Sequence, residues 1–204
     1  LQYTIIFASV LTLVALGGCF SEHSGVINLG LEGIMVMGAL GGAMAMNMFS
    51  SVSNPFLMIL LVCLAAVIFG MLYSCLLAVA SINSNADQTL VGTAMNLLAT
   101  SVAAVMVRAF NSSRNPDDVS TILKYVNQKK LFIVRIGGFE FNWMMLIAVV
   151  LLVVMYIILY KTKFGLRLRA CGENPQAANS VGIDVYKMRW AGVLISGFLG
   201  GLGG

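Results

Sequence analysis

Residues 141–160 read FNWMMLIAVVLLVVMYIILY, twenty residues without a charged side chain. An α-helix rises about 1.5 Å per residue, so about twenty apolar residues cross the hydrocarbon core of a bilayer, which is about 30 Å thick. The run is continuous rather than alternating, which is typical of a spanning helix and not of a barrel strand. This segment predicts a protein whose helices cross a membrane.

The rest of the chain repeats this pattern. Further apolar runs predict spans at 1–20, 26–50, 55–81 and 89–107, and the start of a sixth at 186–204. Of the 204 residues, 59% are hydrophobic and 10% charged, whereas soluble domains carry about 25% charged residues. This composition excludes an ordinary soluble domain and a disordered protein. The predicted fold class is all-α, a polytopic transmembrane helix bundle.

The two ends of the sequence bear on its organisation. It begins at Leu1 and stops at Gly204, inside an apolar stretch. We therefore expect residues 1–204 to form a single transmembrane domain that is part of a longer protein. Small residues four positions apart let helix backbones approach closely in lipid. Close packing is accordingly expected at three pairs of glycines, namely Gly38 and Gly42, Gly197 and Gly201, and Gly200 and Gly204.

Basic residues predict the orientation. Segment 161–189 carries six Lys or Arg against two acidic residues, and four of the basic residues follow span 141–160 within nine positions. Loops with lysine and arginine near a helix end stay in the cytoplasm, and such an excess reflects orientation rather than nucleic-acid binding. We expect 161–185, 81–88 and 21–25 to be cytoplasmic. Segments 51–54 and 111–139, the second of which is also basic, are then outside.

The loop at 161–186 reads KTKFGLRLRACGENPQAANSVGIDVY. Asn174 is a favourable N-cap, Pro175 suits the first helical position and Gly182 is a typical stop, which predicts a helix over roughly 175–181. Its exposed apolar residues are expected to be Ala177, Ala178 and Val181, which are small enough for a partner to approach. A plain turn needs far fewer residues, so the loop is interpreted as a docking element for a cytoplasmic partner.

A second unusual segment lies at 25–33, where three glycines surround two polar residues. Asn28 and Glu32 are four apart, so on a helix they share one face. This pattern predicts a broken or closely packed helix that lines a polar cavity, although Glu32 could instead pair with another helix or lie near the interface. Thr93 and Asn96 begin a polar stripe on the fourth span, which fits substrate contact and interhelical hydrogen bonding equally well. These four residues are the candidates for a substrate path.

Two stretches resemble a known family. FGLRLRACGENPQAANSVGI, residues 164–183, resembles the cytoplasmic coupling loop of ABC-importer permeases of the branched-chain amino acid, simple-sugar and nucleoside branch. SEHSGVINLGLEGI, residues 21–34, resembles a block found in the nucleoside and simple-sugar permeases of that branch. The resemblance covers nearly the whole chain and is weakest across 111–139.

The resemblance implies a multi-pass permease subunit of the cell membrane, in an ATP-driven importer for nucleosides or a simple sugar. It implies three protein partners: a cytoplasmic ABC ATPase, a second permease subunit and an extracytoplasmic substrate-binding protein. The lipid bilayer surrounds the permease, and no nucleic acid is expected as a partner. By position, it assigns ATPase coupling to Gly172, Glu173, Asn174, Pro175, Ala177, Ala178, Gly182 and Ile183. The sequence has no GxxxxGK[ST] motif, so ATP hydrolysis is expected in another subunit, and no catalytic residue, metal or cofactor is assigned.

Three alternatives remain at this point. The first is a permease of the same type that carries branched-chain amino acids. The second is a secondary transporter driven by an ion gradient, which needs ionisable groups in the middle of the membrane, where only Glu32 qualifies. The third is an intramembrane enzyme, which is disfavoured because the spans hold no Ser/His pair, paired carboxylates or metal cluster.

Overall fold

The computed structural model describes residues 2–49, 54–114, 120, 123, 133–136 and 139–204. Most of the predicted loop 111–139 lies outside these residues. The helices are α1 (Gln2–His23), α2 (Leu31–Met48), α3 (Pro55–Ala78), α4 (Gln88–Arg114), α5 (Trp143–Lys161), α6 (Lys163–Glu173), α7 (Pro175–Ser180) and α8 (Val185–Gly203). A π turn, Val79–Asn83, extends α3, and a hairpin of β1 (Ile133–Ile136) and β2 (Phe139–Asn142) precedes α5.

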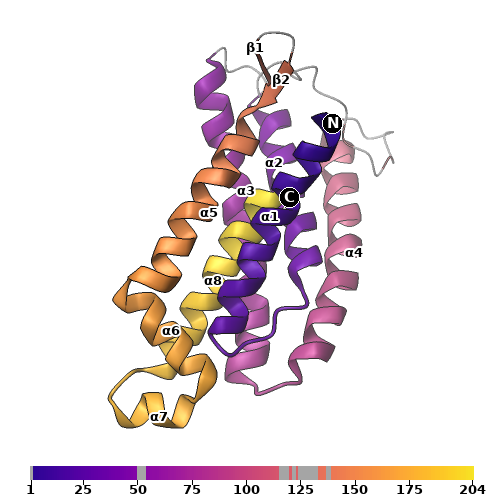
Figure 1. Cartoon of the computed structure of the whole chain (residues 1–204). Helices are drawn as coiled ribbons and strands as arrows, with labels where there is room; N and C mark the ends of the chain where they lie inside the picture. The colour runs from indigo at the N-terminus through magenta and orange to yellow at the C-terminus, as the bar shows by residue number, and fades with distance from the viewer. Residues whose placement is uncertain (1, 50–53, 115–119, 121–122, 124–132, 137–138) are drawn as a thin grey trace.

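The predicted helical bundle is confirmed, with this hairpin as an addition to it (Figure 1). Among the described residues, α1, α2, α3 and α4 are long and apolar enough to cross a membrane, and α5 with α6 form a fifth candidate bent by 70°. The sixth predicted span, α8, is a helix but does not qualify by composition. Its buried residues are mostly glycines, and its first turns carry Lys187 and Arg189.

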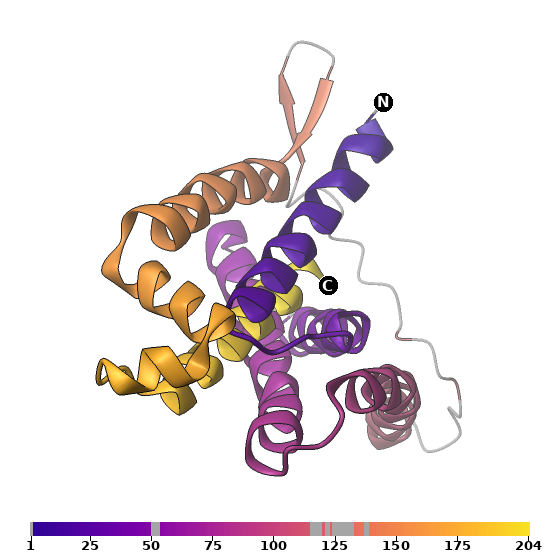
Figure 2. The same ribbon diagram turned by 60° about the horizontal axis from the view of Figure 1, so that its bottom comes forward.

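The position of α8 explains this composition. It packs against α1, α2 and α3, and Figure 2 shows it in the middle of the bundle. A helix enclosed by other helices does not need a lipid-facing surface and can be rich in small residues. Outward-facing apolar side chains are instead common on α1, α3, α4 and α5, where Leu11, Leu72, Leu97 and Val149, respectively, are exposed.

Glycines set the spacing at the centre. A Cβ at Gly38 of α2 would lie 2.5 Å from the carbonyl oxygen of Gly201, and one at Gly70 of α3 would lie 2.6 Å from the Gly201 Cα. Neither distance leaves room for a side chain. The close packing predicted at Gly38 and Gly201 is therefore confirmed, whereas a Cβ at Gly42 would make only ordinary contacts with Val62 and Ala66.

Both polar segments singled out in the sequence lie at one end of the bundle. In Figure 1 this end holds α6, α7, the α1–α2 connection and the α3–α4 turn, while the hairpin is at the opposite end. The α1–α2 connection is not helical between Ser24 and Gly30, so α2 begins at Leu31.

Candidate functional site

The connection between α1 and α2 is a broken stretch of backbone inside the bundle. Gly25 has a φ of 82°, a conformation that residues with a side chain rarely adopt, and it turns the chain out of α1. Ser21 Oγ then donates to the carbonyl oxygen of Val26 over 2.7 Å. The predicted break is confirmed, but the prediction that Asn28 and Glu32 share one helix face is wrong, because Asn28 precedes the first turn of α2.

Side-chain amides from α4 satisfy the broken backbone. The Ile27 N–H donates to Gln88 Oε1 over 2.7 Å, and Asn96 Nδ2 donates to the carbonyl oxygen of Leu29 over 2.9 Å. Asn96 Oδ1 also accepts from the Gly33 N–H over 2.8 Å. Non-helical backbone is tolerated at membrane depth only where protein or water satisfies its polar groups. These bonds therefore hold an irregular segment that lipid alone would not stabilise.

Asn28 braces the same segment from within. Only 5% of its surface is exposed. Its Nδ2 donates to Ser196 Oγ of α8 over 2.9 Å, and its Oδ1 accepts from the Gly30 N–H over 3.1 Å. Asn28 thus links the connection to the central helix and does not lie on an open surface.

Glu32 and Thr93, by contrast, are exposed. Thr93 Oγ1 donates within α4, to the carbonyl oxygens of Thr89 and Leu90 over 3.1 and 3.0 Å. Glu32 has no hydrogen bond or ion pair among the residues that the structure describes. Both side chains therefore place polar atoms on the outside of the bundle.

Helix geometry places these groups on one side of the α2–α4 contact. Gly33 packs against Met95, Asn96 and Ala99, and Gly30 against Gly92, so the two helices run in the same direction. Glu32 is one residue before Gly33, about 100° round α2, and Asn96 is one residue after Met95, about 100° round α4. Between parallel helices, these opposite rotations put Glu32 and Asn96 on the same flank. Thr89, Thr93 and Thr100 continue that flank along α4 at helical spacing.

The predicted docking helix is present as α7, close to the expected bounds 175–181. Asn174 Oδ1 accepts from the Ala177 N–H over 3.1 Å, Pro175 is the first residue of α7, and the helix ends at Ser180. Gly182 has a φ of 84°, and the Ile183 N–H donates to the carbonyl oxygen of Ala178 over 3.1 Å. The turn that closes α7 therefore needs Gly182, because other residues are strained at this φ.

One surface prediction for α7 is wrong. Ala177 is exposed and Val181 is 80% exposed, but Ala178 is only 5% exposed. Because α7 lies against α6 and α8, the face that carries Ala178 turns toward its own protein. Of the three apolar residues expected to be exposed here, only Ala177 and Val181 are accessible.

Sequence reasoning missed α6, because it predicted a helix in this loop only over roughly 175–181. Thr162 caps it by accepting from the Gly165 N–H over 3.2 Å, and Leu168 and Cys171 are fully buried. The signal was present in the sequence, since Phe164, Leu168 and Cys171 recur at i, i+4 and i+7 after a threonine. Cys171, to which no role was assigned from the sequence, is buried in the protein.

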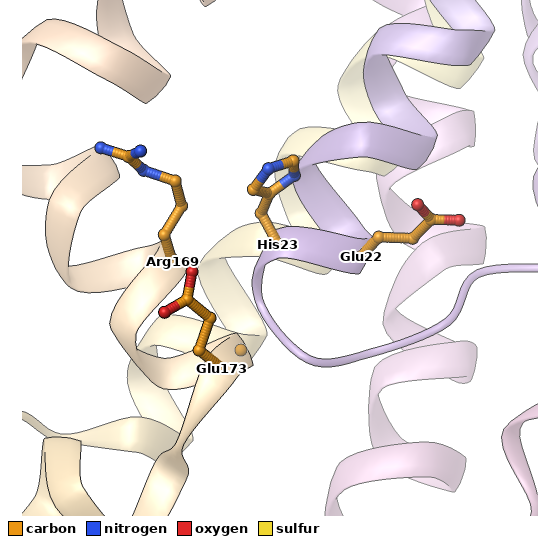
Figure 3. A pocket seen from close by; sticks show the side chains of 5 residues that line it. Glu22, His23, Arg169 and Glu173 are labelled. Atoms are coloured by element: carbon orange, nitrogen blue, oxygen red, sulfur yellow. The ribbon is translucent and has the colours of Figure 1, made fainter.

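The end of the bundle formed by α6, α7 and the start of α8, named the docking end after its predicted role, touches the α1–α2 connection directly. A Cβ at Gly25 would lie 3.3 Å from the Gly172 Cα, and one at Gly172 would collide with the carbonyl oxygen of His23. The last turn of α6 therefore packs backbone to backbone against the exit of α1. Beside this contact lies an open pocket of about 300 Å³ lined by Glu22, His23, Arg169, Gly172 and Glu173 (Figure 3).

The groups around this pocket are engaged with the bundle. His23 Nδ1 lies 2.7 Å from the carbonyl oxygen of Cys19, and the Arg169 guanidinium lies 4.9 Å from the ring centroid of Tyr160. Figure 3 shows Glu22 pointing away from His23 and Arg169. Among the described residues, no three His, Cys, Asp or Glu side chains are placed to hold a metal ion.

A second open pocket lies beside α7. Its volume is about 380 Å³, and its lining comes from α7 and from the start of α8, with Pro175, Gln176, Asn179, Asp184, Val185 and Tyr186. The predicted coupling residues thus surround one feature, a short capped helix with a notch at its side. Glu173, at the end of α6, is exposed, whereas Ile183 is partly buried in the closing turn.

These features define a multi-pass helical membrane protein with a braced break in one helix and a protruding capped helix at the same end. The chain belongs to the family described as the permease component of the branched-chain amino acid transport system, whose model matches residues 1–204.

Its relatives include the nucleoside ABC transporter permease protein NupC of Lactococcus lactis and the guanosine ABC transporter permease protein NupQ of Bacillus subtilis. Each is 40% identical over 98% of this chain, which spans 64% of the relative's length. A second Lactococcus lactis protein, nucleoside ABC transporter permease protein NupB, is 25% identical over 95% of this chain and 55% of its own length. No solved structure matches the chain significantly.

Proposed function

We propose that this chain is the membrane-spanning part of a permease subunit in an ATP-driven importer for nucleosides, with simple sugars as the second substrate class. The observation that carries the proposal is α7, which has a side-chain cap at its start and a glycine turn at its end. Two caps on a helix of six residues keep it folded although Ala177 and Val181 face solvent. An exposed helix held this firmly is suited to transmit force from another protein.

The expected partner at this end is an ABC ATPase on the cytoplasmic side. Ala177 and Val181 supply a small apolar contact, and the neighbouring notch of about 380 Å³ is large enough to accept side chains of that partner. ATP hydrolysis is assigned to that subunit. A second permease subunit and an external substrate-binding protein complete the proposed complex, and the match to two nucleoside permease proteins of Lactococcus lactis supports a paired permease.

The proposed substrate path follows the flank formed by Glu32, Thr93 and Asn96. A carboxylate, an amide and hydroxyl groups match the ring nitrogens and ribose hydroxyls of a nucleoside. Asn28 is assigned to the brace behind this flank, because only 5% of its surface is exposed, whereas Asn96 remains partly exposed. The polar flank then faces the second permease across the path rather than lipid.

The test is reconstitution of the full-length protein with its ATPase, its substrate-binding protein and any second permease in vesicles. We expect uptake of radiolabelled guanosine that requires ATP and is not affected by collapsing ion gradients. Uptake without the ATPase, driven by a proton or sodium gradient, would contradict the proposal and support a secondary transporter. Competition by unlabelled guanosine, glucose and leucine distinguishes the three substrate classes.

A variant tests the path. Glu32→Gln keeps the shape of the side chain but removes its charge, so we expect uptake with a changed KM or maximal rate and unchanged protein abundance. Thr12→Val is the matched control, because Thr12 lies on α1 and its hydroxyl donates only to the carbonyl oxygen of Ala8. Identical kinetics for wild type and Glu32→Gln would remove Glu32 from the path.

A further inference from the structure

Asn83 is the last residue of the π turn between α3 and α4. The wider winding shows in the bond from the Ser84 N–H to the carbonyl oxygen of Val79, which spans five residues over 3.1 Å. Turns of this kind are rare and occur often at functional sites, because a uniform α-helix is more stable. Here the π turn displaces the end of α3 just before the chain reverses into α4.

Two side chains from α8 meet at the Asn83 amide. Asn83 Oδ1 accepts from the Tyr186 hydroxyl over 2.8 Å and from Trp190 Nε1 over 3.3 Å. The indole N–H can only donate, so the amide atom that it meets is the oxygen, and the two lone pairs of that oxygen match two donors. Tyr186 and Trp190 are four residues apart in the first turns of α8.

The contact joins the two segments on which the proposed function depends. On one side, α8 begins directly after α7 and its closing turn, and Asp184 caps it. On the other side, Asn83 is followed by the short turn 84–87 and then by α4, where Asp87 Oδ1 accepts from the Thr89 N–H over 2.8 Å. Helix α4 carries Gln88, which holds the broken connection, and the polar flank.

We propose that Asn83 is a positioning residue that ties the first turns of α8 to the π turn leading into α4, so that a displacement of the docking helix moves the polar flank. This inference rests on the proposed function. Asn83 and Tyr186 are both exposed. Water can therefore replace either partner at low net cost, which lets the contact open and close in each transport cycle.

The first experiment compares Asn83→Ala with Asn83→Asp in the full-length protein, assembled with its partners and reconstituted. Asp keeps an oxygen acceptor at the same position, whereas Ala removes it. We expect Asn83→Ala to raise the number of ATP molecules hydrolysed per guanosine transported by roughly three- to tenfold, the factor by which one hydrogen bond shifts an equilibrium. Asn83→Asp should stay within about twofold of wild type.

The second experiment reports on the contact without transport. In a full-length variant in which Trp190 is the sole tryptophan, its fluorescence reports whether the indole N–H is bonded. We expect iodide to quench Trp190 more strongly after Asn83→Ala and after Tyr186→Phe, but not after Asn83→Asp. If Asn83→Ala fails to fold, Tyr186→Phe still removes one donor and serves in both experiments.

The outcomes separate the two proposals. If wild-type protein moves guanosine only with ATP, and Asn83→Ala shows the wild-type ratio, the role of Asn83 is wrong and the proposed function stands. Equal defects in folded Asn83→Ala and Asn83→Asp would also overturn it, since an acceptor would then not matter. If wild-type protein moves no solute with ATP, the proposed function fails, while the quenching results still decide whether the contact exists.

Discussion

The centre of the bundle and its docking end both use small residues, but for different reasons. At the centre, a Cβ on Gly38 or Gly70 would meet the backbone of Gly201 at 2.5 and 2.6 Å, so small residues are there because no space remains. At the docking end, Ala177 is exposed and a Cβ at Gly182 would meet nothing within 4 Å. Crowding therefore does not explain these two small residues, and Gly182 is required instead by its φ of 84°.

The two regions are also stabilised differently. The centre depends on contacts of α8 with α2 and α3, which lie far earlier in the sequence. The docking helix depends on local bonds, from Asn174 at its start and across Gly182 at its end. A substitution at the centre should therefore damage the fold, and one on the outer face of the docking end should spare the fold and damage transport.

The largest loss of stability is expected where α2 crosses α8 at Gly38 and Gly201. Gly38→Ala should destabilise the protein by about 1–3 kcal/mol, the usual cost of overpacking, because the new methyl group collides with the backbone of Gly201. Gly42→Ala is the matched control on the same helix, since its Cβ would lie 3.5 Å from Val62 Cγ1 and 3.7 Å from Ala66 Cβ. Both changes gain the same helix propensity, about 1 kcal/mol. The difference in stability between the two variants therefore measures the cost of the collision between α2 and α8.

Thermal unfolding of the purified full-length variants in detergent measures this difference. The expected order of unfolding temperature is Gly42→Ala at or above wild type, and Gly38→Ala below it. Equal unfolding temperatures for the two variants would show that the crossing of α2 and α8 is looser than the structure describes.

The next largest loss of stability is expected at the buried one of two adjacent alanines in α7. Ala178→Glu places a carboxyl group at a position that is 5% exposed, where even its neutral form costs about 1–3 kcal/mol to bury unpaired and the ionised form costs more. Ala177→Glu, one residue earlier, points to solvent and should change stability by no more than about 0.5 kcal/mol. We expect Ala178→Glu to unfold at lower temperature, and Ala177→Glu to fold normally but to lose stimulation of the ATPase.

Unfolding temperature and substrate-stimulated ATP hydrolysis, measured on the same preparations, separate the two variants. Normal stimulated hydrolysis by folded Ala177→Glu would show that this face does not dock a partner. The interpretation of Ala178 as a buried residue fails if its glutamate variant is as stable as that of Ala177.

Much of the fold follows from local signals in the sequence. Apolar runs of about twenty residues predict the positions of α1 to α5, because lipid imposes length and composition on every span. The cap at Asn174, the proline after it and the stop at Gly182 predict α7 to within one residue, because all three act through their own backbone. The glycines at Gly38 and Gly201 predict close packing, although not which helices meet.

What the sequence did not predict depends on contacts between distant segments. Ala178 and Ala177 have the same side chain, and only the position of α6 and α8 decides which one is buried. Asn28 and Glu32 have helical spacing, but the bonds from Gln88 and Asn96, more than sixty residues away, stabilise a non-helical connection instead. The role of Asn83 likewise requires the start of α8, which lies more than one hundred residues later.

The smallest change in stability is expected at Asp184, the N-cap of α8. Asp184 caps α8 by accepting from the Lys187 N–H over 3.1 Å, and this bond, followed by the side chain of Lys187 at 3.0 Å, holds the pKa of Asp184 below its ordinary value. A carboxyl whose pKa is lowered on folding stabilises the folded state above its ordinary pKa, about 3.9, and loses that contribution as the pH falls through the lowered value. We therefore expect Asp184→Asn to unfold at a slightly lower temperature than wild type at neutral pH. The gap between the two unfolding temperatures should be the same at pH 6 and pH 8.

Acid should abolish this difference, because protonated aspartate and asparagine are both uncharged. Lys187→Gln is the control, since it removes the ion pair but leaves the backbone bond that caps α8. Its effect should be smaller still, because the Lys187 side chain is 81% exposed and ion pairs at exposed sites contribute little. A difference between Asp184→Asn and wild type that persists in acid would mean that residue 184 acts through its shape rather than its charge. The docking end would then be held, like the centre, by packing.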